Sequence, residues 1–411
     1  MHAKYRLDRG EPGVFVAVGK DRHEQRLGAP ARERRQPRTA LNSAGRVGSE
    51  TPWRERIRMG TYRTDRSYDW NYAHGPVWEG PLPRLPMGPL KRFLGLPVRS
   101  RLGVAAGLLL NAHWIELYAR LGYDILTYKT VRSRARRCHP MPNWVTVDAP
   151  GPLGHGETRC ITKPRRDADP SAVTASVSFG MPSKDPAVWM PDVARARKTL
   201  KAGQVLVVSV VASPEAGGGG RAMIDDFANL AAMAREAGAQ VVEANLSCPN
   251  VCTAEGDIYL DPGLSGRIAR AMHAAAGPVP VALKVGHVPD RRRLGALLRA
   301  VAGEAAAVVL VNGVSRKLYG PNGKPAYGEG RETAGILGRA IHEPAVASVA
   351  SAVDIVRSGR LSLEVIAVGG VASAEDAADF FSAGAHAVMM GSAPMYDPLL
   401  AWRIKRAHPE W

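Results

Sequence analysis

The sequence predicts an α/β fold, a closed (β/α)8 TIM barrel of parallel strands that follows a basic, disordered N-terminal extension. Short apolar runs alternate with helical stretches from about residue 98 onward, a pattern typical of βα units in a parallel sheet. Eight such runs are present, and eight parallel strands close into a barrel. The chain has 411 residues, a length that barrels of this kind reach as one domain.

The composition divides the chain into three parts. Residues 1–58 hold 14 Lys and Arg residues against 7 Asp and Glu residues without apolar periodicity, so we predict a solvated, disordered tail. A more regular segment opens at Met59, which is a second candidate for the first residue of the native protein. Residues 59–97 are predicted to be a lead-in segment that packs on the barrel, and residues 98–411 to be the barrel itself.

The eight predicted strands are nearly continuous apolar runs. Strands of a parallel barrel need this composition because helices cover their outer face while layers of side chains fill the inside. In chain order the runs are Leu102–Gly107, Asp124–Val131, Val205–Val211, Gln240–Asn245, Pro280–Val285, Ala307–Asn312, Glu364–Gly369 and His386–Gly391.

The segments between the strands carry helical and loop signals. Apolar residues recur at helical spacing within Met223–Gly238, and the final glycine ends that pattern. Two connections are unusually long, residues 132–202 and residues 313–332. Long ordered loops are usually functional, and Arg316–Glu332 is a candidate lid over the site.

Polar residues and glycines end most of these runs, at the place where a barrel builds its active site. The carboxyl ends of the strands share one face of the barrel. A strand-end lysine can also pair with a buried carboxylate, and a glycine pair can simply make a βα turn. Glycine turns after strands seven and eight commonly bind phosphate through backbone N–H groups, so lysines on the same face favour an anionic phosphorylated cofactor. The residues concerned are Ala106-Gly107, Lys129-Thr130, Ser209, Asn245, Lys284, Asn312, Gly369-Gly370 and Gly391-Ser392.

One motif makes the pattern specific. The sequence NLSCPNV, Asn245–Val251, directly follows a predicted strand and resembles the active-site signature of the dihydroorotate dehydrogenases. Agreement at six further strand ends extends the resemblance over roughly residues 95–400. These are AAG at Gly107, KTV at Lys129, the strand-end Lys284, VN at Asn312, VGG at Gly370, and MGS at Gly391.

The resemblance implies a flavoprotein that uses FMN. It makes Cys248 and Lys129 the catalytic residues: Cys248 is the base that takes a proton from the substrate, and Lys129 lies between flavin and substrate. Lys284 would stabilise negative charge that develops on the flavin. The implied cofactor-binding residues are Ala106, Gly107, Lys129, Thr130, Ser209, Asn245, Lys284, Asn312, Gly335, Gly369, Gly370, Gly391 and Ser392. The implied substrate-binding residues are Asn245, Asn250, Asn312, Gly180 and Met181.

The sequence departs from the family where the substrate is held. Val177 and Ser183 stand where the family has asparagines, in a loop whose Gly180 and Pro182 are kept, and Gly313 replaces a hydroxyl residue. An unpaired buried polar group costs about 1–3 kcal/mol, so these changes bear on the substrate more than on the cofactor. A basic cluster from Arg132 to Arg137 could receive an anionic substrate or form a solvated loop.

Three functional hypotheses follow from these residues. The first is oxidation of dihydroorotate, or a close dihydropyrimidine, to orotate in pyrimidine biosynthesis, with hydride to FMN and the proton to Cys248. The second is a divergent FMN barrel that acts on another small unsaturated ring, and the third is a non-catalytic flavin-binding protein. The sequence does not select the electron acceptor.

The expected partners are a small-molecule substrate and, by resemblance, a second copy of the chain in a homodimer. The net charge of +17 comes without interleaved aromatic residues or a recognition helix, so nucleic-acid binding is not predicted. No stretch approaches the roughly 20 apolar residues that cross a bilayer, and Met87–Val98 is too short for the helical pair of membrane-docked relatives. The four cysteines and the lack of an apolar signal region favour the cytoplasm. Cys248 and Cys252 lack a second ligand pair, so no metal is predicted.

Overall fold

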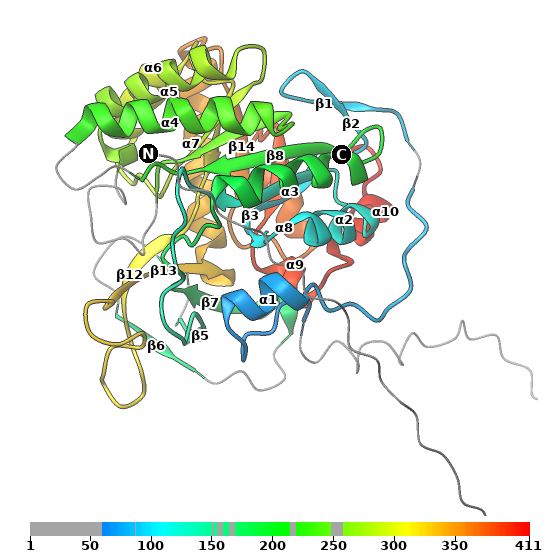
Figure 1. Ribbon diagram of the computed structural model, residues 1–411, viewed down its shortest axis with the longest axis vertical. Coiled ribbons are helices and arrows are strands. Elements are labelled where there is room, and N and C mark those ends of the chain that lie inside the picture. The colour runs from blue at the N-terminus through cyan, green and yellow to red at the C-terminus, as the bar shows by residue number, and fades with distance from the viewer. Residues whose placement is uncertain are drawn as a thin grey trace, which may run out of the picture. The chain divides into compact units, whose positions relative to one another are not determined.

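The eight predicted strands form a closed parallel barrel in the computed structural model (Figure 1). The structure describes residues 60–86, 88–149, 152–153, 159–163, 169–213, 219–247 and 258–411, which all belong to one unit, Glu50–Trp411. Around the barrel the strands follow the order β10-β11-β14-β15-β3-β4-β8-β9. Their bounds are β3 Leu102–Leu109, β4 Ile125–Val131, β8 Val205–Val210, β9 Val241–Asn245, β10 Val281–Lys284, β11 Ala307–Leu310, β14 Glu364–Val368 and β15 Ala387–Met390. All eight strand predictions are confirmed.

Helices cover the outside of this barrel. Several begin at a residue whose side chain accepts a backbone N–H of the first turn, as Asp185, Asp261 and Asp290 do. The predicted helix at Met223–Gly238 is confirmed as α4, whose buried face contains Phe227 and Leu230. The outer helices are α2 Ala112–Arg120, α3 Pro186–Thr199, α4 Gly219–Glu236, α5 Pro262–Ala276, α6 Arg291–Val301, α7 His342–Ser358, α8 Ala374–Ser382 and α10 Leu400–Ala407. Shorter helical segments are α1 Tyr68–His74, α9 Ala393–Tyr396 and the 3-10 turns Pro170–Ala172, Ile258–Leu260 and Arg339–Ile341.

A short hairpin closes the amino-terminal end of the barrel. Strands β1 Lys91–Phe93 and β2 Leu96–Val98 pair antiparallel around Leu94 and Gly95, which both have positive φ as a two-residue hairpin turn requires. Phe93 and Val98 are buried against the inner side chains of the barrel. Within the described residues no helix is long and apolar enough to cross a membrane.

A second, smaller closed sheet lies at the other end of the barrel (Figure 1). Its strands are β5 Trp144–Asp148, β6 Cys160–Thr162, β7 Thr174–Val177, β12 Val314–Tyr319 and β13 Thr333–Gly338. The two long connections of the sequence supply β5, β6, β7 and β12, while β13 directly follows the second connection and pairs with both β12 and β7. The expectation of loops was therefore wrong for these segments, and the start of the candidate lid is strand β12. Val147, Cys160, Leu318 and Ile336 belong to the separate apolar core of this sheet.

Candidate active site

A cavity of about 180 Å³ lies at the carboxyl ends of the main-barrel strands. Strand ends form its base, while β5, β7 and β13 of the small sheet supply Trp144, Val177 and Gly335 to its wall. The cavity thus lies between the two closed sheets. Apolar side chains make up most of its wall and a few polar groups converge on it, which is typical of a cofactor or substrate site.

Most of the predicted site residues line this one cavity. The cavity-lining residues among them are Ala106, Gly107, Lys129, Thr130, Gly180, Met181, Asn245, Lys284, Asn312, Gly335, Gly369, Gly370, Gly391 and Ser392. Ser209 does not line it. The Ser209 hydroxyl lies 3.0 Å from the hydroxyl of Thr130, so it is placed one layer behind the wall. Cys248 and Asn250 lie outside the described residues.

Two buried lysines bring positive charge to the cavity. Lys129 is 8% exposed and Lys284 is 2% exposed. The Lys284 ammonium is 4.0 Å from Oε1 of Glu243, another buried residue two positions before the end of β9. The sequence allowed two roles for a strand-end lysine: pairing with a buried carboxylate, or lining a cofactor site. Lys284 does both, since it contacts Glu243 and also lines the cavity. Its charge is available to an anionic group there.

The two strand-end asparagines brace the turn that follows β9. Asn245 accepts from the backbone N–H of Ser247 at 3.3 Å, and its amide nitrogen is 3.6 Å from the sulfur of Met181. Asn312 donates to the carbonyl of Ser247 at 2.7 Å. Both amides therefore hold the segment that leads from β9 into the signature motif, besides lining the cavity.

Three backbone N–H groups at one edge of the cavity could bind an anion. Among the described residues, the N–H groups of Gly370, Gly391 and Ser392 donate to no protein acceptor. All three residues line the cavity. Unpaired N–H groups in glycine turns are a common way to bind phosphate. These donors lie in the turns after strands seven and eight, where the sequence predicts a phosphate site, and that site stays a prediction.

The apolar wall contains residues that the sequence did not single out. They are Tyr62, Trp144, Phe179, Leu337, Ile341 and Met395. Burial raises the pKa of the Tyr62 hydroxyl, which therefore stays neutral. Tyr62 belongs to the predicted lead-in segment, and nothing in its local pattern marks it as a site residue. Met395 follows Ser392 by three residues, and this short sequence separation from the last glycine turn could have identified it as a site residue.

The three departures from the family pattern do not all face the cavity. Val177 and Gly313 line it. Ser183 does not, because its hydroxyl accepts from the backbone N–H of Arg132 and donates to the carbonyl of Lys184. Only the first two changes can alter contacts within the cavity.

Arg132 is a buried structural residue and not part of a solvated basic loop. It is 0% exposed and donates to the carbonyls of Met181 and Ala212 and to the hydroxyl of Ser213. These bonds tie the segment that carries Gly180 and Met181 to the end of β8. Arg134 and Arg137 are exposed.

The two cysteines of the described segments are poor bases. Burial raises the pKa of Cys138 to about 11, although Lys129 acts in the opposite direction. Burial also raises the pKa of Cys160, which lies in the core of the small sheet. Both thiols stay protonated at neutral pH.

Comparison with known proteins agrees with this architecture. Residues 164–409 match the family model described as dihydroorotate dehydrogenase. A dihydroorotate dehydrogenase of Dictyostelium discoideum is 30% identical over 369 residues, which cover 84% of this chain and 97% of that protein. The catalytic subunit of dihydroorotate dehydrogenase B (NAD(+)) of Solidesulfovibrio magneticus is 35% identical over 45% of this chain and 59% of its own length.

A solved structure shows the same fold. The crystal structure of DHODH from Eimeria tenella in complex with ferulenol superposes with a TM-score of 0.60 at 16% sequence identity, covering 77% of this chain and 82% of that chain. From the matches in sequence, this chain belongs to the dihydroorotate dehydrogenase family of oxidoreductases, which act on CH–CH bonds.

Proposed function

We propose that the chain binds FMN in this cavity and oxidises dihydroorotate, or a close dihydropyrimidine, to the conjugated ring. One observation carries the proposal. Two buried lysines, two asparagines and the N–H groups of two glycine turns converge on a single cavity. These are the groups that a phosphorylated cofactor and a planar polar ring require.

The donor set fits FMN. Gly370, Gly391 and Ser392 would hold the phosphate through their N–H groups, and Lys284 would lie near the part of the flavin that becomes negative on reduction. The bound flavin supplies the capacity to accept two electrons as a hydride. The chain supplies orientation, charge and the removal of a proton.

The remaining roles belong to residues of this chain. The amides of Asn245 and Asn312 can donate to and accept from the edge of a pyrimidine ring. The thiolate of Cys248 would take the proton that leaves the substrate as the hydride departs, which returns Cys248 to a thiol. The assignment of Cys248 rests on the NLSCPNV motif. The high pKa of Cys138 and the burial of Cys160 speak against either as a substitute.

A second candidate is oxidation or reduction of a different, less polar unsaturated ring. Val177 and Gly313 favour it, because both face the cavity where the family pattern has an amide and a hydroxyl. A polar substituent on the substrate would lose two hydrogen-bonding partners there, each worth about 1 kcal/mol.

Anaerobic mixing of the FMN-loaded protein with dihydroorotate tests the proposal. Flavin absorbance should bleach rapidly in the wild-type protein and at least about a hundredfold more slowly in Cys248→Ala, since general base catalysis contributes about that much. Cys160→Ala is the matched control and should bleach like the wild type. Bound flavin that bleaches only with a less polar ring, or with dihydroorotate only after Val177→Asn, would favour the second candidate. Bound flavin that no such ring reduces would make the chain a non-catalytic flavin protein.

A further inference from the structure

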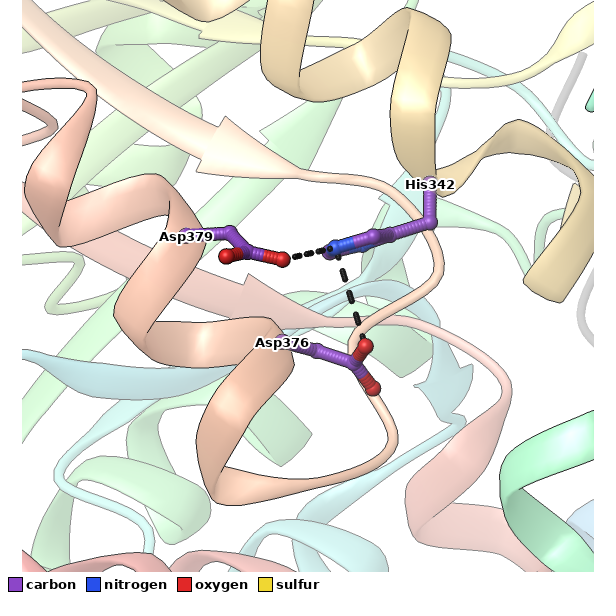
Figure 2. A group of neighbouring side chains, drawn as sticks. All are labelled: His342, Asp376 and Asp379. Carbon is purple, nitrogen blue, oxygen red and sulfur yellow. Dashed lines mark hydrogen bonds and ion pairs between the residues drawn. The ribbon is translucent and has the colours of Figure 1, made fainter.

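His342, Asp376 and Asp379 form a cluster outside the cavity wall, and the imidazole of His342 points toward both carboxylates (Figure 2). His342 is the first residue of α7 and is 2% exposed, and the two aspartates come from α8. Nε2 of His342 lies 3.0 Å from Oδ2 of Asp379 and 3.6 Å from Oδ1 of Asp376. On its other side, Nδ1 lies 3.1 Å from the carbonyl oxygen of Gly369.

We propose that His342 is a positioning residue for the cofactor phosphate, acting through the peptide unit between Gly369 and Gly370. This inference rests on the proposed binding of FMN. A carbonyl oxygen can only accept, so the hydrogen bond to Gly369 needs a hydrogen on Nδ1, and the carboxylates likewise accept from Nε2. The aspartates and the edge-on ring of Phe380, 5.3 Å away between centroids, fix the orientation of the imidazole.

Because a peptide unit is planar, the contact at the carbonyl of Gly369 also sets the direction of the N–H of Gly370. The carbonyl of Gly369 and the N–H of Gly370 belong to one planar trans unit, so they point to opposite sides. Fixing the carbonyl on His342 turns that N–H away from α7. This is one of the three cavity-edge N–H groups that donate to no protein acceptor in the described part of the chain.

The turn needs such a clamp because both of its residues are glycines with positive φ, 148° at Gly369 and 70° at Gly370. Glycine lacks the steric restriction that would hold the peptide plane in one orientation. His342 is also close to the turn, since a Cβ on Gly370 would lie 2.8 Å from the Cβ of His342 and 3.1 Å from its Cα. The glycine turn therefore packs tightly against the first residue of α7.

A metal ion is the competing occupant of the three side chains. The contacts already present favour the clamp, because Arg339 donates to Oδ1 of Asp376 at 2.6 Å and the backbone N–H of Ala372 donates to Oδ2. Both oxygens of Asp376 are thus engaged, and Arg339 supplies a positive charge at this carboxylate.

Two substitutions of His342 separate its two contacts. The amide nitrogen of Asn reaches the position of Nδ1, and that of Gln reaches the position of Nε2. Flavin binding to the apoprotein is measured by fluorescence titration with FMN and, in parallel, with riboflavin, which lacks the phosphate. His342→Gln should weaken FMN binding about tenfold and leave riboflavin binding within about twofold, while His342→Asn should bind both like the wild type.

His273→Gln is the matched control. His273 is also a helical histidine whose Nδ1 contacts a backbone carbonyl, that of Glu304 at 2.8 Å, and it does not line the cavity. This variant should bind FMN normally. Circular dichroism of each apoprotein separates loss of binding from loss of folding.

The outcomes are distinct. Normal FMN binding by His342→Gln, or an equal loss for riboflavin, would overturn the inference while leaving the proposed function standing. FMN binding that EDTA abolishes and Zn²⁺ restores would overturn it in favour of a metal site. A wild-type protein that binds no FMN would overturn the proposed function and this inference with it.

Discussion

At the scale of single residues, the buried charges Lys284 and Glu243 couple the site to the stability of the fold. Their side chains are 2% and 4% exposed, and their charged atoms are 4.0 Å apart. Removing one member of a buried pair leaves the other without a partner in a medium of low dielectric constant, which costs several kcal/mol. The cation that faces the cavity is therefore also a structural requirement.

We predict that Lys284→Met lowers the free energy of unfolding of the apoprotein by about 3 kcal/mol, because Glu243 is left buried and unpaired. Urea denaturation followed by circular dichroism measures the change. The double variant Lys284→Met/Glu243→Gln should regain at least about 1 kcal/mol of this loss. A double variant less stable than the single one would show that the two charges are not coupled.

Arg132 gives a second residue-scale prediction. Arg132→Lys keeps the charge but cannot reach the carbonyls of Met181 and Ala212 together with Ser213, so about 2 kcal/mol of unfolding free energy should be lost. Thermal denaturation measures the effect, and the exposed Arg137→Lys is the control that should change it by less than about 0.5 kcal/mol. Equal stability of the two variants would contradict the structural role of Arg132.

At the scale of elements, the turns after β14 and β15 differ in the space around their glycines. A Cβ on Gly370 would lie 2.7 Å from the carbonyl of Gly338, and its φ of 70° is strained for other residues. A Cβ on Gly391 would meet no atom within 4 Å, although the residue lines the cavity. The first glycine is required by the protein and the second leaves room for a ligand.

These two turns should therefore respond differently to alanine. Gly391→Ala should keep the melting temperature of the apoprotein but weaken FMN binding at least about tenfold, because its methyl group enters the cavity. Gly370→Ala should destabilise the apoprotein by about 2 kcal/mol. Differential scanning fluorimetry and fluorescence titration separate the two effects. Unchanged FMN binding by Gly391→Ala would place the ligand elsewhere.

At the scale of the whole molecule, the cavity joins two closed sheets with separate apolar cores. A ligand held between them binds only the folded state, so it adds to stability by mass action. FMN at 100 times its dissociation constant should add about 2.7 kcal/mol, which corresponds to a rise in melting temperature of about 5 °C. Riboflavin at the same concentration should give a smaller rise, since it cannot use the N–H groups of Gly370 and Gly391. No rise with FMN would argue against binding between the sheets.

The main barrel and about half of the residues that line its cavity could be predicted from the sequence alone. Each strand is buried on both faces, so a continuous apolar run marks it without knowledge of its neighbours. When parallel strands close into a barrel, their carboxyl ends meet at one face. Lys129, Lys284 and the glycine turns therefore line one cavity, as the sequence predicts.

The small sheet, the buried position of Arg132 and the contact between His342 and Gly369 could not be predicted from the sequence. The small sheet pairs β7 with β13, segments about 160 residues apart whose short strands carry no distinct period. Arg132 lies within a basic run, yet three distant acceptors bury it. His342 contacts Gly369 and Asp379 from different βα units. Such contacts depend on which residues meet across the fold, and that information is not local to any one segment.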